Sequence, residues 1–176
     1  MTTDNITRAE LFPAYLYIAP EGTNEDDTVN ERYFAGPTAG PVDVCIRENV
    51  HNVRDMFGNT VCDIHYGGRL EIKGHLASVS PHSLALLFGA KDNGTGRLEI
   101  PESGARRRFS VCVVSPLGTD QKAFSLFLRT ATASSPKLSL NLPESDTVEF
   151  TITSENSYGR SSASLSFMPR TQAVGA

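Results

Sequence analysis

Tryptophan is absent from this chain of 176 residues, and tyrosine occurs only five times. Sugar-binding domains stack their ligands on exposed aromatic rings, so the composition disfavours a carbohydrate-binding module. No apolar run approaches the roughly 18 residues of a transmembrane helix, and the N-terminus does not resemble a secretion signal. The three cysteines, Cys45, Cys62 and Cys112, are odd in number and far apart, which argues against a disulfide framework. We therefore expect synthesis in a reducing cytoplasm and no membrane partner.

Basic residues are also fewer than acidic residues. The chain has 16 lysines and arginines against 20 acidic residues, for a formal net charge of −4. A protein whose task is to grip nucleic acid through its phosphates needs a basic surface, so this class is disfavoured. The single basic cluster, Arg106 to Arg108, opens a predicted strand and is more typical of a solvated edge.

Patterns of catalysis and metal binding are missing as well. The sequence has no Walker loop, no G-x-S-x-G elbow and no dinucleotide-binding glycine loop. Cys62 and His65 have the spacing of half a zinc site, but residues three apart on a strand face opposite sides and no second ligand pair follows. The stretch 92–94 resembles the start of a calcium loop without its remaining ligands. We expect a protein that is not an enzyme and has no cofactor and no metal.

What the chain does contain is strand periodicity. A hydrophobic content of 39% and a charged content of 20% are typical of a soluble globular protein, and the length predicts a single domain over 1–176. Alternating apolar and polar residues predict a series of strands and one dependable helix. The strands are expected at 14–19, 42–46, 60–66, 69–76, 97–100, 107–115, 122–133, 137–142, 147–153 and 161–167. The fold class is therefore mainly β, a two-sheet β-sandwich or barrel with one short α-helix.

Four segments are predicted to lie outside this framework. They are a flexible N-terminal arm (about 1–12), long loops at 20–41 and 47–59, and a C-terminal tail (168–176). Both loops exceed the usual length of a connection, which indicates mobility or a role in contacts. Gly67-Gly68 predicts a tight hairpin turn between two strands.

The stretch "RLEIKGHLASVSPHSLALLFGA", residues 69–90, predicts a strand that runs directly into a short helix. Ser80 can cap this helix, Pro81 suits its first position and Gly89 its end. On a helical wheel the residues of one apolar stripe are Leu84, Leu87 and Phe88. Leu86 lies almost opposite that stripe, so either a loop of the same chain or a neighbouring subunit is expected to cover it.

Residues 70–89 have the form L-x-I-x-G-x-L-A-x-V followed at once by S-P-x-S-L-A-L-L-F-G. This stretch resembles the tail tube (major tail) proteins of tailed bacteriophages, with His82 where an acidic residue is common. The resemblance implies a β-sandwich or barrel whose subunits form hexameric rings that stack into a tube. It also implies that the sheets of adjacent subunits join to line the lumen and that the helix lies at the subunit junction.

The same resemblance implies partners and a location. The chain would assemble with copies of itself and would meet a tape measure protein, a tail terminator and baseplate proteins. DNA would pass through the lumen without specific binding. The protein would be made in the cytoplasm of the host bacterium and would reside in the phage tail of the virion.

Several residues become candidates for assembly on this interpretation. Leu86 is expected at the subunit interface. Met56 and Phe57 form an apolar pair in the loop at 47–59, and we expect them either to mediate contacts between rings or to tuck onto their own domain. Glu71 and Lys73 lie on the polar face of their strand and are expected on a lumen wall that is neutral to acidic.

The phase of the strands also predicts which thiols are accessible. Cys45 shares the polar side of its strand with Asp43 and Arg47, so its thiol should be accessible. Cys62 is in phase with Ile64 and Tyr66, so its thiol should be buried.

Other functions stay open at this point. The nearest alternatives are a related tail component, such as a tail terminator or a baseplate hub, and the tube of a contractile injection machine. A β-sandwich binding module is more distant because exposed aromatic residues are scarce, and an enzyme on a β-barrel would need converging histidines and carboxylates.

Overall fold

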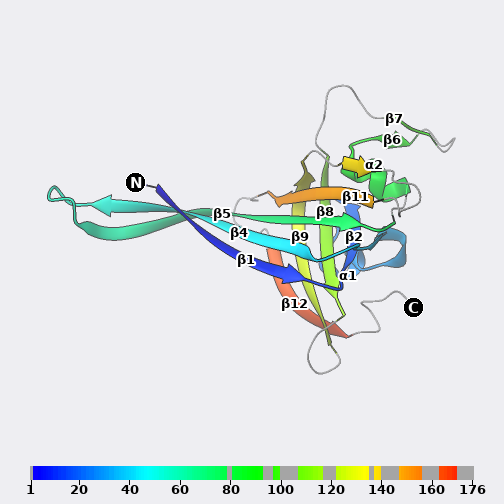
Figure 1. Cartoon of the computed structure of the whole chain (residues 1–176), viewed down its shortest axis with the longest axis horizontal. Coiled ribbons are helices and arrows are strands. Elements are labelled where there is room, and N and C mark those ends of the chain that lie inside the picture. The colour runs from blue at the N-terminus through cyan, green and yellow to red at the C-terminus, as the bar shows by residue number, and fades with distance from the viewer. Residues whose placement is uncertain are drawn as a thin grey trace.

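Antiparallel strands account for most of the chain in a computed structural model that describes residues 2–78, 81–92, 97–99, 107–116, 122–134, 137–139, 147–155 and 163–169 (Figure 1). The strands are β1 (Thr2–Leu11), β2 (Tyr15–Pro20), β3 (Phe34–Pro37), β4 (Val42–Arg54), β5 (Thr60–Leu76), β6 (Lys91–Asp92), β7 (Leu98–Glu99), β8 (Arg108–Ser115), β9 (Lys122–Ala133), β10 (Lys137–Ser139), β11 (Thr147–Ser154) and β12 (Ala163–Pro169). The helices are α1 (Glu25–Thr28), the 3-10 turn η1 (Glu31–Tyr33) and α2 (Pro81–Leu87). A mainly β fold is thereby confirmed.

The main sheet closes on itself as a barrel. Its strand order is β1-β4-β5-β11-β9-β8-β2-β3, with β10 added beside β11 and β12 beside β9. The far end of β3 returns to β5, where Thr38 forms a bridge with Leu76 and the Ala77 amide donates to the Pro37 carbonyl at 2.9 Å. Strands β5, β11, β9, β8, β2 and β3 therefore surround one interior, which leaves few open edges.

Both faces of β8 are buried, so a further segment of the chain has to pack over its outer face. One face of β8 contributes Phe109, Val111 and Val113 to the core inside the barrel, as the alternation predicts. The opposite face places Cys112 and Val114 in a second cluster, whose other members are Tyr17, Ala123 and Phe127. Half-buried Tyr15, Val29 and Phe34 pack over that cluster. The stretch 20–41, predicted as a loop, is therefore a strap that carries α1, η1 and β3 and shields the second cluster from water.

The Glu25 carboxylate in α1 connects the strap to two strands of the sheet. Asn24 caps α1 by accepting from the Asp27 amide at 2.8 Å. Glu25, the first residue of α1, accepts a hydrogen bond from the Ser125 hydroxyl on β9 at 2.9 Å and one from the Ser164 hydroxyl on β12 at 3.1 Å. Burial, together with the Glu25 charge, raises the pKa of the Cys112 thiol far above its ordinary value. Glu25 thus ties the N-terminal third of the chain to β9 and β12.

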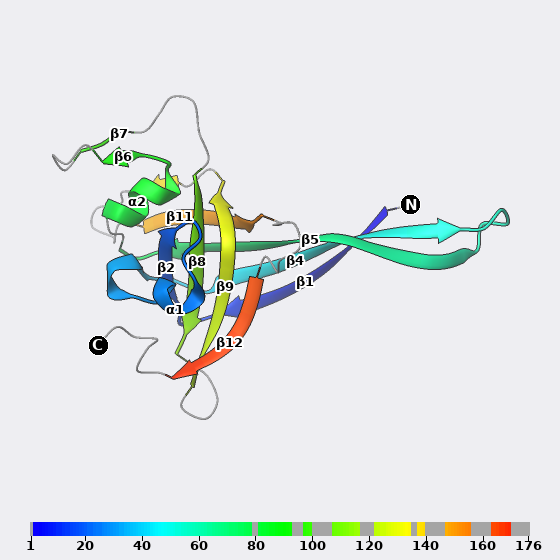
Figure 2. The ribbon, with the colours of Figure 1, turned by 180° about the vertical axis from the view of Figure 1, so that it is seen from behind.

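Strands β1, β4 and β5 extend beyond the barrel as a long arm (Figures 1 and 2). β1 pairs with β4 from Leu11 opposite Val42 to Thr2 opposite His51. The β4–β5 hairpin continues further, to Arg54 opposite Thr60. The N-terminal arm predicted at 1–12 is therefore mostly a strand, and the loop predicted at 47–59 is a strand with a turn at its end.

A bulge explains why the predicted hairpin turn at Gly67-Gly68 is wrong. Glu48 pairs with Gly68, whereas the next residue of β4, Asn49, pairs with Tyr66, so Gly67 is the extra residue of a bulge within the continuous strand β5. Glycine favours bulges as well as turns because it tolerates unusual backbone angles. Pairing with β4 continues on both sides of the bulge, and this pairing keeps β5 in one piece.

Helix α2 begins at Pro81 as predicted, and Gly89 follows it with a φ of +65°. The cap predicted at Ser80 lies outside the described residues. The helix buries Ser83, Ala85 and Leu87, and the half-buried side chains that pack against the main core are Leu84, Leu86 and Phe88. The sequence predicted that Leu84, Leu87 and Phe88 are buried and that Leu86 is not. This contrast is wrong in part, because Leu84 and Phe88 are only half-buried, as Leu86 is. None of the described helices is long and apolar enough to cross a membrane.

The predicted C-terminal tail at 168–176 falls partly within β12, which continues to Pro169. Residues 170–176 lie outside the described part of the chain.

Candidate functional site

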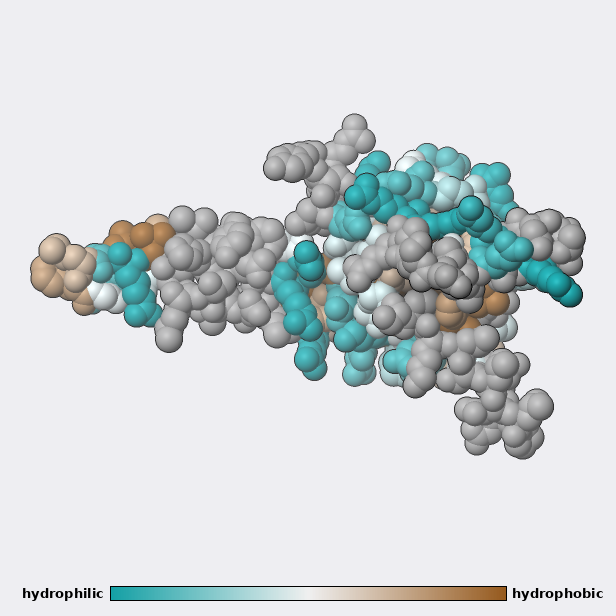
Figure 3. Space-filling model, turned by 90° about the horizontal axis from the view of Figure 1, so that it is seen from above, coloured by the Kyte–Doolittle hydropathy of each residue, from teal (hydrophilic) through white to brown (hydrophobic). Residues whose placement is uncertain are grey.

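The end of the β4–β5 hairpin, residues 55–61, is the most apolar exposed feature among the described side chains, and we call it the tip. Met56 is 91% exposed, Phe57 is 82% exposed and Val61 is 65% exposed. Figure 3 shows hydrophobic residues gathered at this far end of the arm. The alternative in which Met56 and Phe57 tuck onto their own domain is therefore wrong, since the arm holds them away from the barrel.

A set of hydrogen bonds fixes the shape of the tip. The Asp55 carboxylate accepts from the Phe57 amide at 2.9 Å, from the Asn59 amide at 2.8 Å and from the Asn59 side chain at 3.2 Å. The Asp55 amide donates to the Asn59 carbonyl at 2.9 Å, and Gly58 takes a φ of +85° that suits glycine. The turn is therefore already ordered, and little conformational entropy remains to be lost when Met56 and Phe57 meet a partner.

The same hydrogen bonds predict how the tip responds to acid. They lower the pKa of Asp55, with the Asn59 amide as the largest cause. A carboxylate with a lowered pKa stabilises the ordered turn at pH values above its unfolded pKa of about 3.9, and this stabilisation is lost as pH falls through the lower folded pKa. We expect the protection of the Phe57 and Asn59 amide protons, measured relative to an unstructured chain at the same pH, to fall only below about pH 4. An Asp55→Asn variant should lack this step, and an Asp55 titration midpoint at or above its ordinary value would contradict the prediction.

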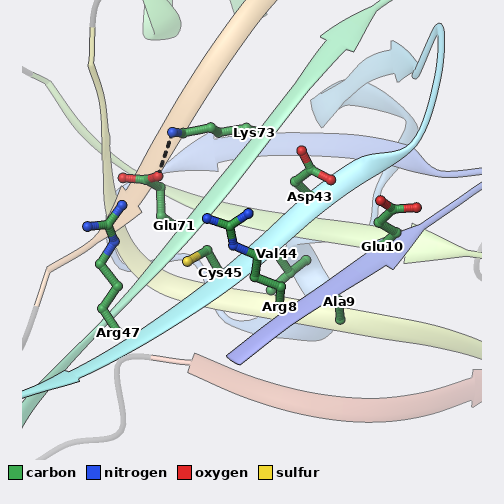
Figure 4. Close-up of a pocket in the computed structure, with 9 residues that line it drawn as sticks. All are labelled: Arg8, Ala9, Glu10, Asp43, Val44, Cys45, Arg47, Glu71 and Lys73. Carbon is green, nitrogen blue, oxygen red and sulfur yellow. Dashed lines mark ion pairs between the residues drawn. The ribbon is translucent and has the colours of Figure 1, made fainter. Parts of the chain in front are cut away.

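The polar face of the arm holds a shallow pocket of about 490 Å³ at the point where the arm leaves the barrel (Figure 4). Its lining residues are Arg8, Ala9 and Glu10 from β1, Asp43, Val44, Cys45 and Arg47 from β4, and Glu71 and Lys73 from β5. The register places Cys45 between Arg8 and Glu71, and Asp43 between Glu10 and Lys73. Lys73 forms an ion pair with Glu71 at 2.9 Å. The two residues predicted for the lumen wall thus lie side by side on one charged surface.

Charges of both signs are balanced on this face. The cations that the register places there are Arg8, Arg47, Arg69 and Lys73, and the acids are Glu10, Asp43, Glu71 and Glu149. Within the described residues, no group of three or more potential ligands is arranged to hold a metal ion. This face therefore carries charges of both signs and little net charge.

The thiols are placed differently from the prediction. Cys62 is exposed on the arm, Cys45 is half-buried in the pocket and Cys112 is buried in the second cluster. The prediction of a buried Cys62 is wrong. Alternation along a strand shows which residues share a face, but that face is buried only where another layer covers it. At Cys62 the arm consists of β4 and β5 alone, and the neighbouring Val61 is exposed as well.

Thiol labelling of the native monomer should follow this order. We expect Cys62 to react first, Cys45 more slowly and Cys112 only on unfolding, because the thiolate of Cys112 would have to form inside an apolar cluster. Mass spectrometry of peptides after timed alkylation measures the three rates. Faster labelling of Cys45 than of Cys62 would contradict the exposure of the arm.

Three features of the site were not found from sequence. Val61 and Phe12 are exposed, at 65% and 57%, and the Asp55 carboxylate organises the tip. The signal for Asp55 was available, since aspartate followed three residues later by glycine is common turn chemistry. Leu86 is half-buried against the main core of its own chain, and its role at an interface stays a prediction.

No protein-family model matches the chain, and no curated protein matches it. Among solved structures, the chain is similar to one described as the crystal structure of Hcp protein. The identity is 12%, the match covers 88% of this chain and 98% of that chain, and the TM-score is 0.36. A likeness at this level does not indicate a function.

Proposed function

We propose that the chain is a structural protein that assembles with copies of itself into stacked rings and so forms the tail tube of a bacteriophage. The observation that carries this proposal is the strand-paired arm that ends in an ordered turn with exposed Met56 and Phe57. A monomer seldom maintains an ordered apolar surface that its own core does not use, whereas an interface requires one.

Open strand edges supply a way for rings to close. Within the described residues, β1 pairs only with β4 and β12 only with β9, so each leaves one edge unpaired. An unpaired edge favours pairing with another chain, and head-to-tail pairing that closes on itself gives a ring. Joined sheets of this kind would surround a common lumen.

The polar face of the arm supports a lumen wall. Glu71 and Lys73 compensate each other there, and the remaining charges of the face are balanced. DNA binds surfaces that release its counterions through positive charge, so a neutral wall lets it pass without retention. The lumen of the assembled tube is proposed to be lined by this face.

The assignment to a phage tail rests on the resemblance of residues 70–89 to the tail tube family. Six subunits per ring, a location in the virion, and contacts with a tape measure protein, a terminator and a baseplate follow from that resemblance. On this proposal the chain performs no catalysis, and its function is mechanical.

Negative-stain electron microscopy of the purified chain over a range of concentrations tests the proposal. We expect stacked rings or long tubes. Single rings that do not stack would favour a tail terminator or hub, and stable monomers at high concentration would overturn self-assembly altogether. A tube structure with Glu71 and Lys73 on its outer surface would overturn the lumen assignment.

A further inference from the structure

The exposed large apolar side chains of the described residues fall near the two ends of β4. Met56, Phe57 and Val61 occupy the tip, and Phe12, which is 57% exposed, is the fourth. Phe12 follows the end of β1, where Leu11 pairs with Val42, the first residue of β4. The tip follows the opposite end of β4. This strand has 13 residues, so about 40 Å separate the two sites at about 3.3 Å per residue.

Opposite charges accompany these two apolar sites. Arg54 is exposed beside the tip, and the carboxylate of the neighbouring Asp55 is engaged by the Phe57 and Asn59 amides, so Arg54 is the cation available beside the tip. Glu10 and Asp43 are exposed and directly opposite each other, two residues or fewer from the Leu11–Val42 pair beside Phe12. Neither forms an ion pair with any described residue, although Lys73 lies opposite Asp43 on its other side, and the two directly opposed carboxylates repel each other.

We propose that the tip of one copy docks on the site around Phe12 of the next copy. Met56 and Phe57 then cover Phe12, while Arg54 lies against Glu10 and Asp43. This inference rests on the proposed self-assembly and names the surface that receives the tip. Because the two sites lie at opposite ends of β4, the contact is head-to-tail and repeats from copy to copy.

The apolar and charged parts of this contact have separate tasks. Apolar burial supplies most of the affinity, and the ordered turn lowers the entropy lost on docking. The charges favour this register, since Glu10 and Asp43 are directly opposed acids, whereas elsewhere on the face Arg54 would meet Arg8, Arg47 or a Glu71 that is already paired with Lys73. The repeat of the assembly along the arm is thereby fixed by the length of β4.

A charge exchange tests the contact in the full-length chain. We expect Arg54→Glu alone and Glu10→Arg alone each to raise the concentration needed for assembly about tenfold, which corresponds to about 1.4 kcal/mol per contact. The double variant should assemble near the wild-type concentration because the pair is restored with its signs reversed. All three variants should melt at the wild-type temperature, since both side chains are exposed.

Cross-linking gives an independent measurement. In a chain with Cys45 and Cys62 replaced by serine, Phe57→Cys protein is mixed with Phe12→Cys protein and oxidised mildly. A heterodimeric disulfide between the two is expected. If wild-type tubes form while the double variant fails to recover and no mixed disulfide appears, the docking site is wrong and self-assembly stands. If the wild-type chain stays monomeric, both proposals are overturned.

Discussion

A chain in which a two-residue Asn-Gly turn replaces Asp55–Asn59 is expected to keep its melting temperature and to form no tubes. The replacement joins Arg54 to Thr60, which are already paired, through the tight turn that suits antiparallel strands. The removed residues are exposed or nearly so, and changes at such positions usually alter stability by less than about 0.5 kcal/mol. Assembly, by contrast, loses two apolar anchors of roughly 1.5–3 kcal/mol each at every contact.

Thermal melting combined with electron microscopy measures both effects. The matched control keeps the length of the turn and changes only Met56 and Phe57 to serine, so that Asp55 still organises the backbone. Both chains should melt like the wild type and remain as rings or monomers. Tubes of normal length from either chain would show that the tip has no role in stacking.

A pair of substitutions in α2 should separate folding from assembly. Leu87 is only 3% exposed within the main core, so Leu87→Asp places a carboxylate where no water or partner can reach it. Such a burial costs several kcal/mol out of a typical total stability of 5–15 kcal/mol. We expect Leu87→Asp to unfold the chain at room temperature or to lower its melting temperature by more than 10 °C.

Leu86→Asp should behave differently, because Leu86 is half-buried and its carboxylate can turn toward water. The loss should be limited to part of one leucine side chain, about 1–2 kcal/mol. The folded monomer should persist while ring formation fails, since a subunit junction would bury the charge. Circular dichroism measures whether each variant is folded, and electron microscopy measures whether it assembles. Assembly of Leu86→Asp into normal tubes would remove Leu86 from the interface.

Much of the barrel could be predicted from sequence because its strands obey period two. In β8, Phe109, Val111 and Val113 alternate with smaller residues, and this face does enter the main core. The start of α2 was also predictable, since Pro81 and Gly89 act through local backbone preferences. These signals are local and do not depend on which strand pairs with which.

The arm could not be predicted because its strands depend on partners distant in sequence. Residues 2–11 are largely polar and show little periodicity, and they form β1 only through pairing with residues 42–51. Glycine at Gly67 is compatible with a bulge or a turn, and the pairing with β4 selects the bulge. Cys62 was expected to be buried because phase cannot reveal whether a second layer exists. The exposed pair at Met56 and Phe57 was identified as a candidate, but its outward orientation depends on the Asp55 turn.

The Glu25 carboxylate, which joins the hydroxyls of Ser125 and Ser164, bears on how a newly made chain reaches its final state. β12 follows every other described strand, so the ribosome delivers it after them. Until then the edge of β9 from Lys122 to Leu128 lacks its partner, and Glu25 lacks the hydrogen bond from the Ser164 hydroxyl. An open edge recruits any strand nearby, including one from a neighbouring nascent copy. The interval between translation of β9 and of β12 is therefore a period in which polysome-bound subunits are exposed to mispairing at this edge.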